Sequence, residues 1–259
     1  MSPSKIIVFA SFLFQVNSRA FSQDAIMIHQ GEIEFERRLN AFAILDQYYS
    51  TDAATGGAQF AQQYKAANPQ FKISRFILSF NDDLSYYAPG PADQAKPNPF
   101  LSTLAESNIV YSDLKAKTAV TEKSIFGKPY LIGDSIRKIH WKITSEIKMI
   151  AGFSCRRANA IIMDSVYVVA FYTDEIVPRG GPESFTGLPG MILGIALPYD
   201  HTTWFATRVS LKPVSNAHFR SPTGEKKISN RELKDILTND PTIKTNQQKQ
   251  DLYFHKLLL

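Results

Sequence analysis

The residues that could carry out chemistry are spread thinly along this chain. No two histidines have the i, i+4 spacing that grips a metal ion from one helix face. Asp200-His201 places an acid beside an imidazole, but neighbours on a strand point to opposite faces. The sequence patterns of common hydrolases, nucleotide-binding loops and paired-cysteine sites are missing. We therefore predict no catalytic residue, no metal and no cofactor. The histidines are His29, His140, His201, His218 and His255.

Cys155 and one acidic triplet are the other candidates for chemistry. Cys155 is the single cysteine, which excludes an internal disulfide and a thiolate cluster. We predict that it is buried and inert, with pairing to another molecule as the alternative. Asn81-Asp82-Asp83 offers oxygen ligands for calcium but lacks the glycine and closing glutamate of an EF-hand loop. A solvated turn is the better interpretation.

The composition is typical of a folded protein. Of the 259 residues, 20% are charged and 12% are aromatic, whereas disordered chains are rich in charge and poor in aromatics. The net charge of +5 is not gathered into a basic stripe, so we predict no nucleic-acid binding. No apolar run reaches the ~18 residues of a membrane-spanning helix, so the chain is not predicted to span a membrane.

Residues 1–22 have the pattern of a secretory signal peptide. Lys5 supplies the positive start, residues 6–14 form a short apolar core, and Ala20-Phe21-Ser22 places small residues where signal peptidase cleaves. We predict cleavage before Gln23 and a periplasmic or outer-membrane-associated location. A buried N-terminal strand is the alternative.

Strand patterns dominate the mature chain. Apolar and polar residues alternate repeatedly, and strands do not alternate regularly with helices, which indicates an antiparallel sheet in a mostly β (α+β) fold. We predict a single domain over residues 23–241 and a loose C-terminal tail over residues 242–259. Residues 57–67 are predicted to be helical, and strands are predicted at residues 32–36, 71–80, 84–87, 138–150, 153–163, 166–173, 191–197 and 202–212.

The clearest alternation lies in residues 138–150. Its lysines fall on one face, which we predict to be solvated, and its large apolar residues fall on the other, which we predict to be covered. The apolar set is Ile139, Trp141, Ile143, Ile147 and Met149.

A late helix has a strong start signal. Ser229 and Glu232 are spaced as a capping box, and Ile228 and Leu233 are spaced as a hydrophobic staple. Leu233, Ile236 and Leu237 then form one apolar stripe, and Asp240-Pro241 ends the helix. By contrast, four prolines in residues 88–105 exclude regular structure there, so we predict a surface excursion, with a disordered insert as the alternative.

Residues 180–193, which we call the glycine–proline segment, form the most distinctive motif in the sequence. Pro189-Gly190 suits a type II turn, because proline fixes its own φ and glycine accepts a positive φ. Leu188 is pushed towards an extended conformation by the proline that follows it. The segment is predicted to be a rigid entry into the strand at 191–197. A rim where a ligand or partner backbone approaches the glycines closely is the second interpretation.

This segment resembles the hallmark of the GLPGLI family, exported envelope proteins of Gram-negative bacteria. The hallmark stands here as Gly187-Leu188-Pro189-Gly190-Met191-Ile192, with methionine in the fifth position. Upstream, residues 141–158 and 172–182 resemble other elements of the family, although Phe171 stands where the family usually has tryptophan. The matched positions, which we predict to be structural, are Trp141, Gly152, Cys155, Gly181, Pro182, Gly187, Leu188, Pro189 and Gly190.

The resemblance implies a fold but carries no established activity. The strand order is similar to the curved half-barrels of periplasmic lipoprotein carriers, which implies a curved antiparallel sheet or half-barrel packed against one or two helices. On that analogy our first hypothesis is a non-catalytic carrier of an apolar small molecule, lipid or peptide. Trp141, Phe153, Phe171 and Leu193 would then line the groove.

Two other classes of function stay open. The second hypothesis is a structural or interaction protein that docks to an outer-membrane transport or secretion complex. Its exposed contact loops would be residues 88–105 and 180–190. The third is an enzyme that is metal-assisted through His140, His201 or Cys155.

Overall fold

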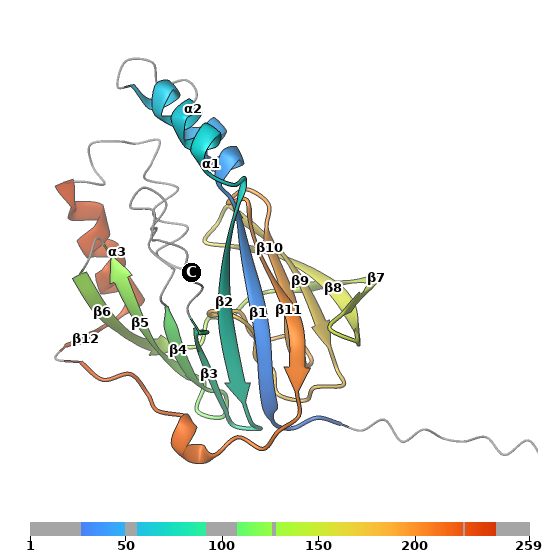
Figure 1. Ribbon diagram of the computed structural model, residues 1–259. Helices are drawn as coiled ribbons and strands as arrows, with labels where there is room; N and C mark the ends of the chain where they lie inside the picture. Colours follow the sequence, from blue (N-terminus) through green and yellow to red (C-terminus); the bar gives the residue numbers. More distant parts are fainter. Residues whose placement is uncertain (1–26, 50–55, 92–107, 126–127, 225, 242–259) are drawn as a thin grey trace, which may run out of the picture.

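The described strands form one open, curved sheet (Figure 1). The computed structural model describes residues 27–49, 56–91, 108–125, 128–224 and 226–241. The predicted signal peptide and tail, and residues 92–105 of the predicted excursion, lie outside this part of the chain. The sheet has twelve strands in the order β12-β6-β5-β4-β3-β2-β1-β11-β10-β9-β8-β7, and only the β12–β6 pair is parallel. The mostly β fold and the curved sheet are thus confirmed.

The strand bounds agree with the sequence pattern in most of the chain. Hairpins such as β2–β3 and β8–β9 join strands that neighbour one another in sequence. The strands are β1 (Gly31–Asn40), β2 (Phe71–Phe80), β3 (Leu84–Pro89), β4 (Ile109–Asp113), β5 (Thr118–Ile125), β6 (Lys128–Ser135), β7 (Lys142–Ile150), β8 (Phe153–Ile162), β9 (Val166–Thr173), β10 (Met191–Leu197), β11 (Thr202–Ser210) and β12 (Lys227–Ile228).

The three α-helices of the described residues lie in two places, beyond the ends of two central strands and beside one edge of the sheet. α1 (Ala41–Tyr49) and α2 (Gly57–Ala67) pack on each other beyond the end of β1 and β2, around their own small apolar cluster (Figure 1). α3 (Asn230–Asn239) packs against β6, where Leu233 and Leu237 meet Ile125 and Ile132. A short 3₁₀ helix, η1 (Asn216–His218), lies in the connection after β11.

The start of α3 confirms the capping prediction. Ser229 Oγ accepts a hydrogen bond from the Glu232 amide at 3.1 Å, and Glu232 Oε2 accepts from the Ser229 amide at 2.7 Å. Ile228 and Leu233 pack in one cluster, as a staple requires. Ile236 departs from the predicted stripe because it is exposed, so α3 buries a narrower face than its sequence suggests.

The main core lies on the inner face of the sheet, the face that carries Phe35, Phe76, Tyr87 and Trp204. Cross-strand register places Phe35 opposite both Phe76 and Ala206, and Trp204 opposite Ile195. Residues 174–190 run across this face, where Phe185 and Leu188 are fully buried. The sheet therefore curves around a segment of its own chain.

The apolar face predicted for residues 138–150 is only partly covered, whereas Lys138, Lys142 and Lys148 are exposed as predicted. β7 begins at Lys142, and its register against β8 shifts between Ile143 and Ile147, which breaks the alternation. Ile147 and Met149 are each 63% exposed. On the other side, Lys148 Nζ lies 4.6 Å from the ring centroid of Phe205 and 5.5 Å from that of Phe171. The lysine, not the isoleucine, faces the aromatic side chains of the sheet.

Some regular structure was not predicted. β4, β5 and β6 have mixed sequences in which serine, threonine, lysine and aspartate occupy positions on the inner face. Ala88 and Pro89 belong to β3, paired with Ile77 and Phe76, so the start of the predicted 88–105 excursion is a strand.

Candidate functional site

The glycine–proline segment inserts a carboxylate into the inner face of the sheet. Glu183 is only 3% exposed and adopts a left-handed backbone conformation with φ of 54°. Its Oε2 accepts a hydrogen bond from Asn108 Nδ2 at 3.0 Å. The turn around it is closed by the Phe185 amide, which donates to the Pro182 carbonyl at 3.2 Å. The segment is thus more than a rigid connection, because it positions a buried charge.

Glu183 lies among polar side chains from five other places in the chain. We call this group the polar cluster; all its members are buried. It comprises Arg37 on β1, Tyr87 on β3, Asn108 just before β4, Lys123 on β5, Glu183 and Trp204 on β11.

Burial and neighbouring charges change the protonation of this cluster. Burial raises the pKa of Glu183, while the Asn108 hydrogen bond and the charges of Lys123 and Arg37 oppose the rise. Burial lowers the pKa of Lys123 to about 8, and the charge of Arg137 adds to that effect. Burial also raises the pKa of Tyr87 well above its ordinary value, with the charge of Glu183 as the second cause. The cluster therefore carries its charges at a cost in desolvation.

The hydrogen bonding of the cluster is incomplete. The Tyr87 hydroxyl is shared between Glu183 and Trp204, and its hydrogen bonds with these two side chains contribute to its pKa shift. Asn108 Oδ1 is buried and has no hydrogen-bond partner among the described residues. Buried polar atoms are paired in the great majority of native proteins. This acceptor therefore points to a water molecule or a ligand.

Aromatic packing holds the cluster rigid. The Tyr87 ring stacks on Phe76 with centroids 4.9 Å apart and meets Phe35 edge to face at 6.4 Å. The Arg37 guanidinium carbon lies 5.4 Å from the centroid of the Trp204 ring. Such contacts fix the directions of the polar atoms at the ends of these side chains.

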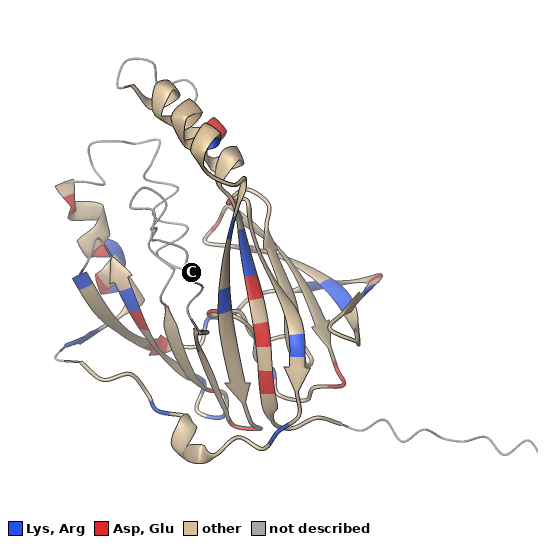
Figure 2. Cartoon of the chain, viewed as in Figure 1, with Lys and Arg blue, Asp and Glu red and all other residues tan. Residues whose placement is uncertain are grey.

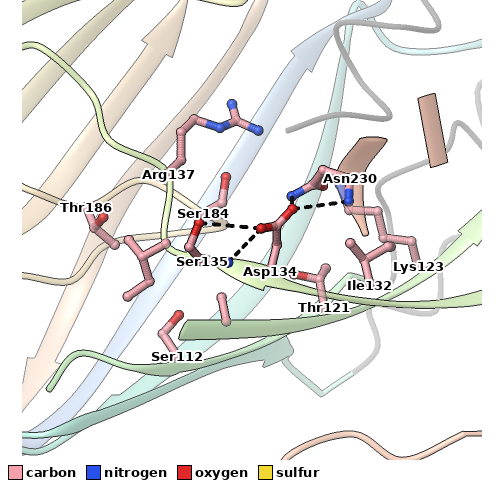
Figure 3. Close-up of a pocket in the computed structure, with 12 residues that line it drawn as sticks. Ser112, Thr121, Lys123, Ile132, Asp134, Ser135, Arg137, Ser184, Thr186 and Asn230 are labelled. Carbon is pink, nitrogen blue, oxygen red and sulfur yellow. Dashed lines mark hydrogen bonds between the residues drawn. The ribbon is translucent and has the colours of Figure 1, made fainter. Parts of the chain in front are cut away.

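A partly open pocket adjoins the cluster at Lys123 (Figure 3). About 40 Å³ of it is open to the centre of a water-sized sphere, which is room for a few water molecules or a small ionic group. β4, β5, β6, the glycine–proline segment and the start of α3 all contribute to its wall. The lining residues are Ser112, Ala119, Thr121, Lys123, Ile132, Asp134, Ser135, Ile136, Arg137, Ser184, Thr186 and Asn230.

Asp134 in this pocket is fully engaged. Its Oδ1 accepts from the Ser135 amide at 2.7 Å, and its Oδ2 accepts from the amide and side chain of Asn230 at 3.2 and 3.1 Å (Figure 3). Although burial favours the neutral acid, these hydrogen bonds lower the pKa of Asp134. The carboxylate thus ties β6 to the first turn of α3.

The predicted structural residues gather around the glycine–proline segment. Trp141 Nε1 donates to the Thr186 carbonyl at 2.9 Å, which links the residues before β7 to the segment. A Cβ at Gly181 would lie 2.7 Å from the Phe185 carbonyl oxygen, so the turn that presents Glu183 has no room for a side chain there. Gly152 lies apart, at the tip of the β7–β8 hairpin with φ of 88° and open space around it.

The turn at Pro189-Gly190 is not type II. The Gly190 amide donates to the Leu188 carbonyl at 2.8 Å, which closes a three-residue turn around Pro189, and the Met191 amide donates to Ile176 instead. Gly190 has φ of 145°, and a Cβ there would lie 2.1 Å from the Thr173 carbonyl oxygen. Glycine is therefore required by close approach to the end of β9.

Two further expectations concern exposure. The predicted contact loop at residues 180–190 is mostly buried, with only Gly187 and Pro189 exposed. Of the candidate groove residues, Leu193 is fully buried in the main core, Phe171 packs on Phe205, and Phe153 packs on the edge of the same cluster. The structure places all three in packed surroundings, away from the polar cluster's pocket.

Cys155 is buried, and burial raises the pKa of its thiol to about 12. Among the described residues, no group of three or more histidine, cysteine or acidic side chains is arranged to hold a metal ion. Asp200 and His201 lie in the turn before β11 and not on a strand, and His201 Nε2 contacts Gln47 Oε1 at 2.9 Å. Asn81 Oδ1 accepts from the Asp83 and Leu84 amides, as expected of a turn.

Comparison with known proteins supports the fold and leaves the activity open. A family model described as a protein of unknown function, Porph_ging, matches residues 161–194, which include β9, the glycine–proline segment and the start of β10. No curated protein matches the chain. Among solved structures, PNGF-II in space group P21 covers 82% of this chain with a TM-score of 0.51 and 16% identity. PNGF-II in space group C2 gives the same coverage and TM-score with 14% identity.

These similarities support a conclusion about the fold and not about the activity. At this level of identity, the similarity to PNGF-II shows a shared fold alone. The chain corresponds to 33% of the length of the PNGF-II chain. In the described residues, no helix is long and apolar enough to cross a membrane.

The polar cluster was missed by reasoning from the sequence. Glu183 lies in a loop, and nothing in the linear pattern shows which way a loop residue points. Lys123 sits in a strand that reads as polar throughout, so its inward direction was hidden. One feature of the sequence could have indicated the burial of Glu183. It is a charged residue between Gly180-Gly181-Pro182 and Phe185, in a segment that is otherwise largely uncharged.

Proposed function

We propose that this is an exported, non-catalytic envelope protein of the GLPGLI type that binds a ligand on the inner face of its sheet. One observation carries the proposal: Asn108 Oδ1, in the buried cluster around Glu183, has no hydrogen-bond partner among the described residues. A core that served stability alone would be expected to pair this atom or to replace the buried polar side chains with apolar ones.

The cluster adds a requirement to the ligand predicted from the sequence. We still propose that the apolar part of the ligand is a lipid, an acyl chain or a hydrophobic peptide. The ligand also needs a polar group able to donate to Asn108 Oδ1 or to replace the hydrogen bonds that Tyr87 makes with Glu183 and Trp204.

The test is native mass spectrometry of the mature protein purified from a bacterial periplasm, followed by lipid extraction of any adduct. We expect a reproducible bound mass in the wild type. Tyr87→Phe should deplete it, because the hydroxyl is lost while the ring keeps its packing on Phe76. Tyr86→Phe, on the neighbouring position of β3, is the matched control and should keep the adduct.

A clean apo mass in the wild type, before and after incubation with an extract of envelope lipids and peptides, would refute the binding proposal. Equal loss of the adduct in Tyr86→Phe and Tyr87→Phe would show that the polar cluster is not the binding site.

A docking role is the second candidate, favoured by one different observation. Ile147 and Met149, two residues apart on β7, are large apolar side chains exposed at the edge of the sheet. Contiguous exposed apolar surface commonly marks an interaction site. A photo-crosslinker at position 147 should then capture an envelope protein in intact cells. The same group at Lys72, on β2 at the middle of the sheet, should not.

A further inference from the structure

We propose that the β7 edge of the sheet pairs with the same edge of a second copy of this chain. The two strands run antiparallel, related by a two-fold axis at Ile147. The pairing rests on the docking role given above as the second candidate, and it makes another copy of the chain the partner. Three features of β7 carry the proposal: an open backbone edge, exposed apolar side chains and a matched pair of charges.

The backbone of β7 is open on one side within the described part of the chain. β7 is the last strand of the sheet, so β8 is its single neighbour there. An edge strand presents a row of amide and carbonyl groups with which a further strand can pair. The helices of the described residues pack near β2 and β6 and do not cover this edge (Figure 1). A strand of a second molecule can therefore extend the sheet beyond β7.

Two exposed apolar side chains share one face of this edge. Ile147 and Met149 are each 63% exposed, and they point to the same face because they are two residues apart on a strand. With the axis at Ile147, this residue lies directly opposite the partner's Ile147, and each Met149 lies diagonally across from it. The pairing thus gathers four exposed apolar side chains, and their removal from water favours association.

The other face of the edge carries two charges of opposite sign. Lys148 lies over the ring of Phe171, and Arg157 is the cross-strand neighbour of Phe171. Glu146 Oε2 accepts a hydrogen bond from Arg157 Nη1 at 2.6 Å. Glu146 and Lys148 therefore lie on the same face, and both are exposed. Figure 2 shows that charges of both signs occur at this end of the sheet.

The order of these charges favours the axis at Ile147. Glu146 of each copy then lies opposite the partner's Lys148, which gives two attractive cross-strand pairs. Moving the axis by one residue places either Glu146 opposite the partner's Glu146 or Lys148 opposite the partner's Lys148. Like charges directly opposite each other are destabilising. One short segment thus supplies both halves of a self-complementary contact, as a two-fold interface requires.

Sedimentation velocity of the mature protein over a range of concentrations is the first test. We expect a reversible dimer in the wild type that dominates by about 100 μM, an affinity typical of a small interface. Ile147→Lys should weaken dimerisation at least tenfold, because it removes the apolar contact and opposes two like charges. Ile161→Lys is the matched control and should stay within twofold. Ile161 is 64% exposed on β8, outside the stretch that pairs with β7.

An exchange of charges tests the register. Glu146→Lys and Lys148→Glu should each weaken dimerisation at least fivefold on their own, because each variant opposes two pairs of like charges. An equimolar mixture of the two variants should dimerise again, since each copy then supplies the charge that the other needs. The mixture also controls for folding, because a variant that had lost its fold could not regain a partner by mixing.

A wild type that stays monomeric at every concentration would overturn the proposal, and so would a dimer that Ile147→Lys leaves intact. A mixture of the two charge variants that stays monomeric would refute the axis at Ile147. The photo-crosslinker at position 147 separates self-pairing from the docking role. A product with twice the mass of the mature chain supports both. A product with a different envelope protein alone keeps docking and refutes self-pairing. No product, together with a monomeric wild type, refutes both.

Discussion

At the scale of single residues, the unusual feature is a set of charges kept inside a mostly apolar sheet. Glu183 has a left-handed backbone conformation, which is costly for a residue with a side chain. Two residues earlier, Gly181 has no room for a Cβ. Burial works against the ionised forms of both Glu183 and Lys123. Strain and desolvation at one place are what proteins tolerate at sites of function.

Lys123 should make stability depend on alkaline pH. In the folded protein its pKa is lowered from 10.5 to about 8, so between these values the unfolded chain holds a proton that the folded chain has released. A rise in pH through this window therefore favours the folded state. From about pH 7 to about pH 10, the free energy of unfolding of the wild type should rise by about 2–3 kcal/mol relative to Lys123→Met.

Urea unfolding at a series of pH values measures this difference, in which the titration of Tyr87 and of other groups common to both proteins cancels. Lys128→Met, at an exposed position on the neighbouring strand, should follow the wild type. Parallel curves for the wild type and Lys123→Met would show that Lys123 is not desolvated as described.

Gly190 should tolerate substitution poorly. A side chain there would clash with the Thr173 carbonyl oxygen, and the φ of Gly190 is unfavourable for any residue with a side chain. Gly190→Val should therefore lower the free energy of unfolding by more than about 3 kcal/mol. Gly152→Val is the matched control: its φ is also positive but nothing lies within 4 Å of its Cβ, so roughly 1–3 kcal/mol is expected. Chemical denaturation gives both values, and similar losses would contradict the role of close approach.

At the scale of elements, the edge strand β7 shows how register can override an alternating pattern. The shift between Ile143 and Ile147 changes which side chains face the sheet, so Lys148 lies over Phe205 and Phe171 while Ile147 and Met149 face solvent. Ile150, one residue further, is buried against the outer face at Gly194. The β7–β8 hairpin thus covers the outer face of the sheet with Ile150 near its tip and with the aliphatic part of the Lys148 side chain.

Alanine substitutions in β7 test this arrangement. Met149→Ala should change the free energy of unfolding by no more than about 0.5 kcal/mol, because the side chain is exposed. Ile150→Ala should cost about 2–4 kcal/mol, because it empties packed space. A larger loss at Met149 than at Ile150 would restore the faces predicted from the sequence.

At the scale of the whole molecule, a single sheet carries apolar clusters of unequal size. The large cluster joins β1, β2, β3 and β7 to β11 with Val110 of β4, whereas α1 and α2 pack in a separate small one that includes Ile44, Leu45 and Tyr64. Regions with few buried contacts open locally more easily than a continuous core. The helical hairpin is thus a weakly attached unit on a strongly connected sheet.

Amide hydrogen exchange should reveal this hierarchy. We expect β9 and β10 to exchange slowest and α1–α2 to exchange much faster. Leu45→Ala, which removes a fully buried side chain from the helical cluster, should speed exchange in α1–α2 and leave β9 and β10 unchanged. Accelerated exchange throughout the sheet would instead show that the hairpin and the sheet unfold as one unit.

Features that depend on local chemistry could be predicted from the sequence. The helix at residues 57–67, the capping box at Ser229, the turn at Asn81 and most strands of the second half follow from periodicity, capping and turn propensity, which act over a few residues. The need for glycine at position 190 was also visible, although the turn that requires it has a different form.

Tertiary structure alone decided which side chains meet. Lys123 and Glu183 lie 60 positions apart, and only the curvature of the sheet brings β5 to the segment that carries Glu183. The faces of β7 depended on a register shift against β8, which no alternation within β7 reveals. Direction and register are set by contacts between distant segments, so the buried polar site could not be predicted from the local patterns that predicted its scaffold.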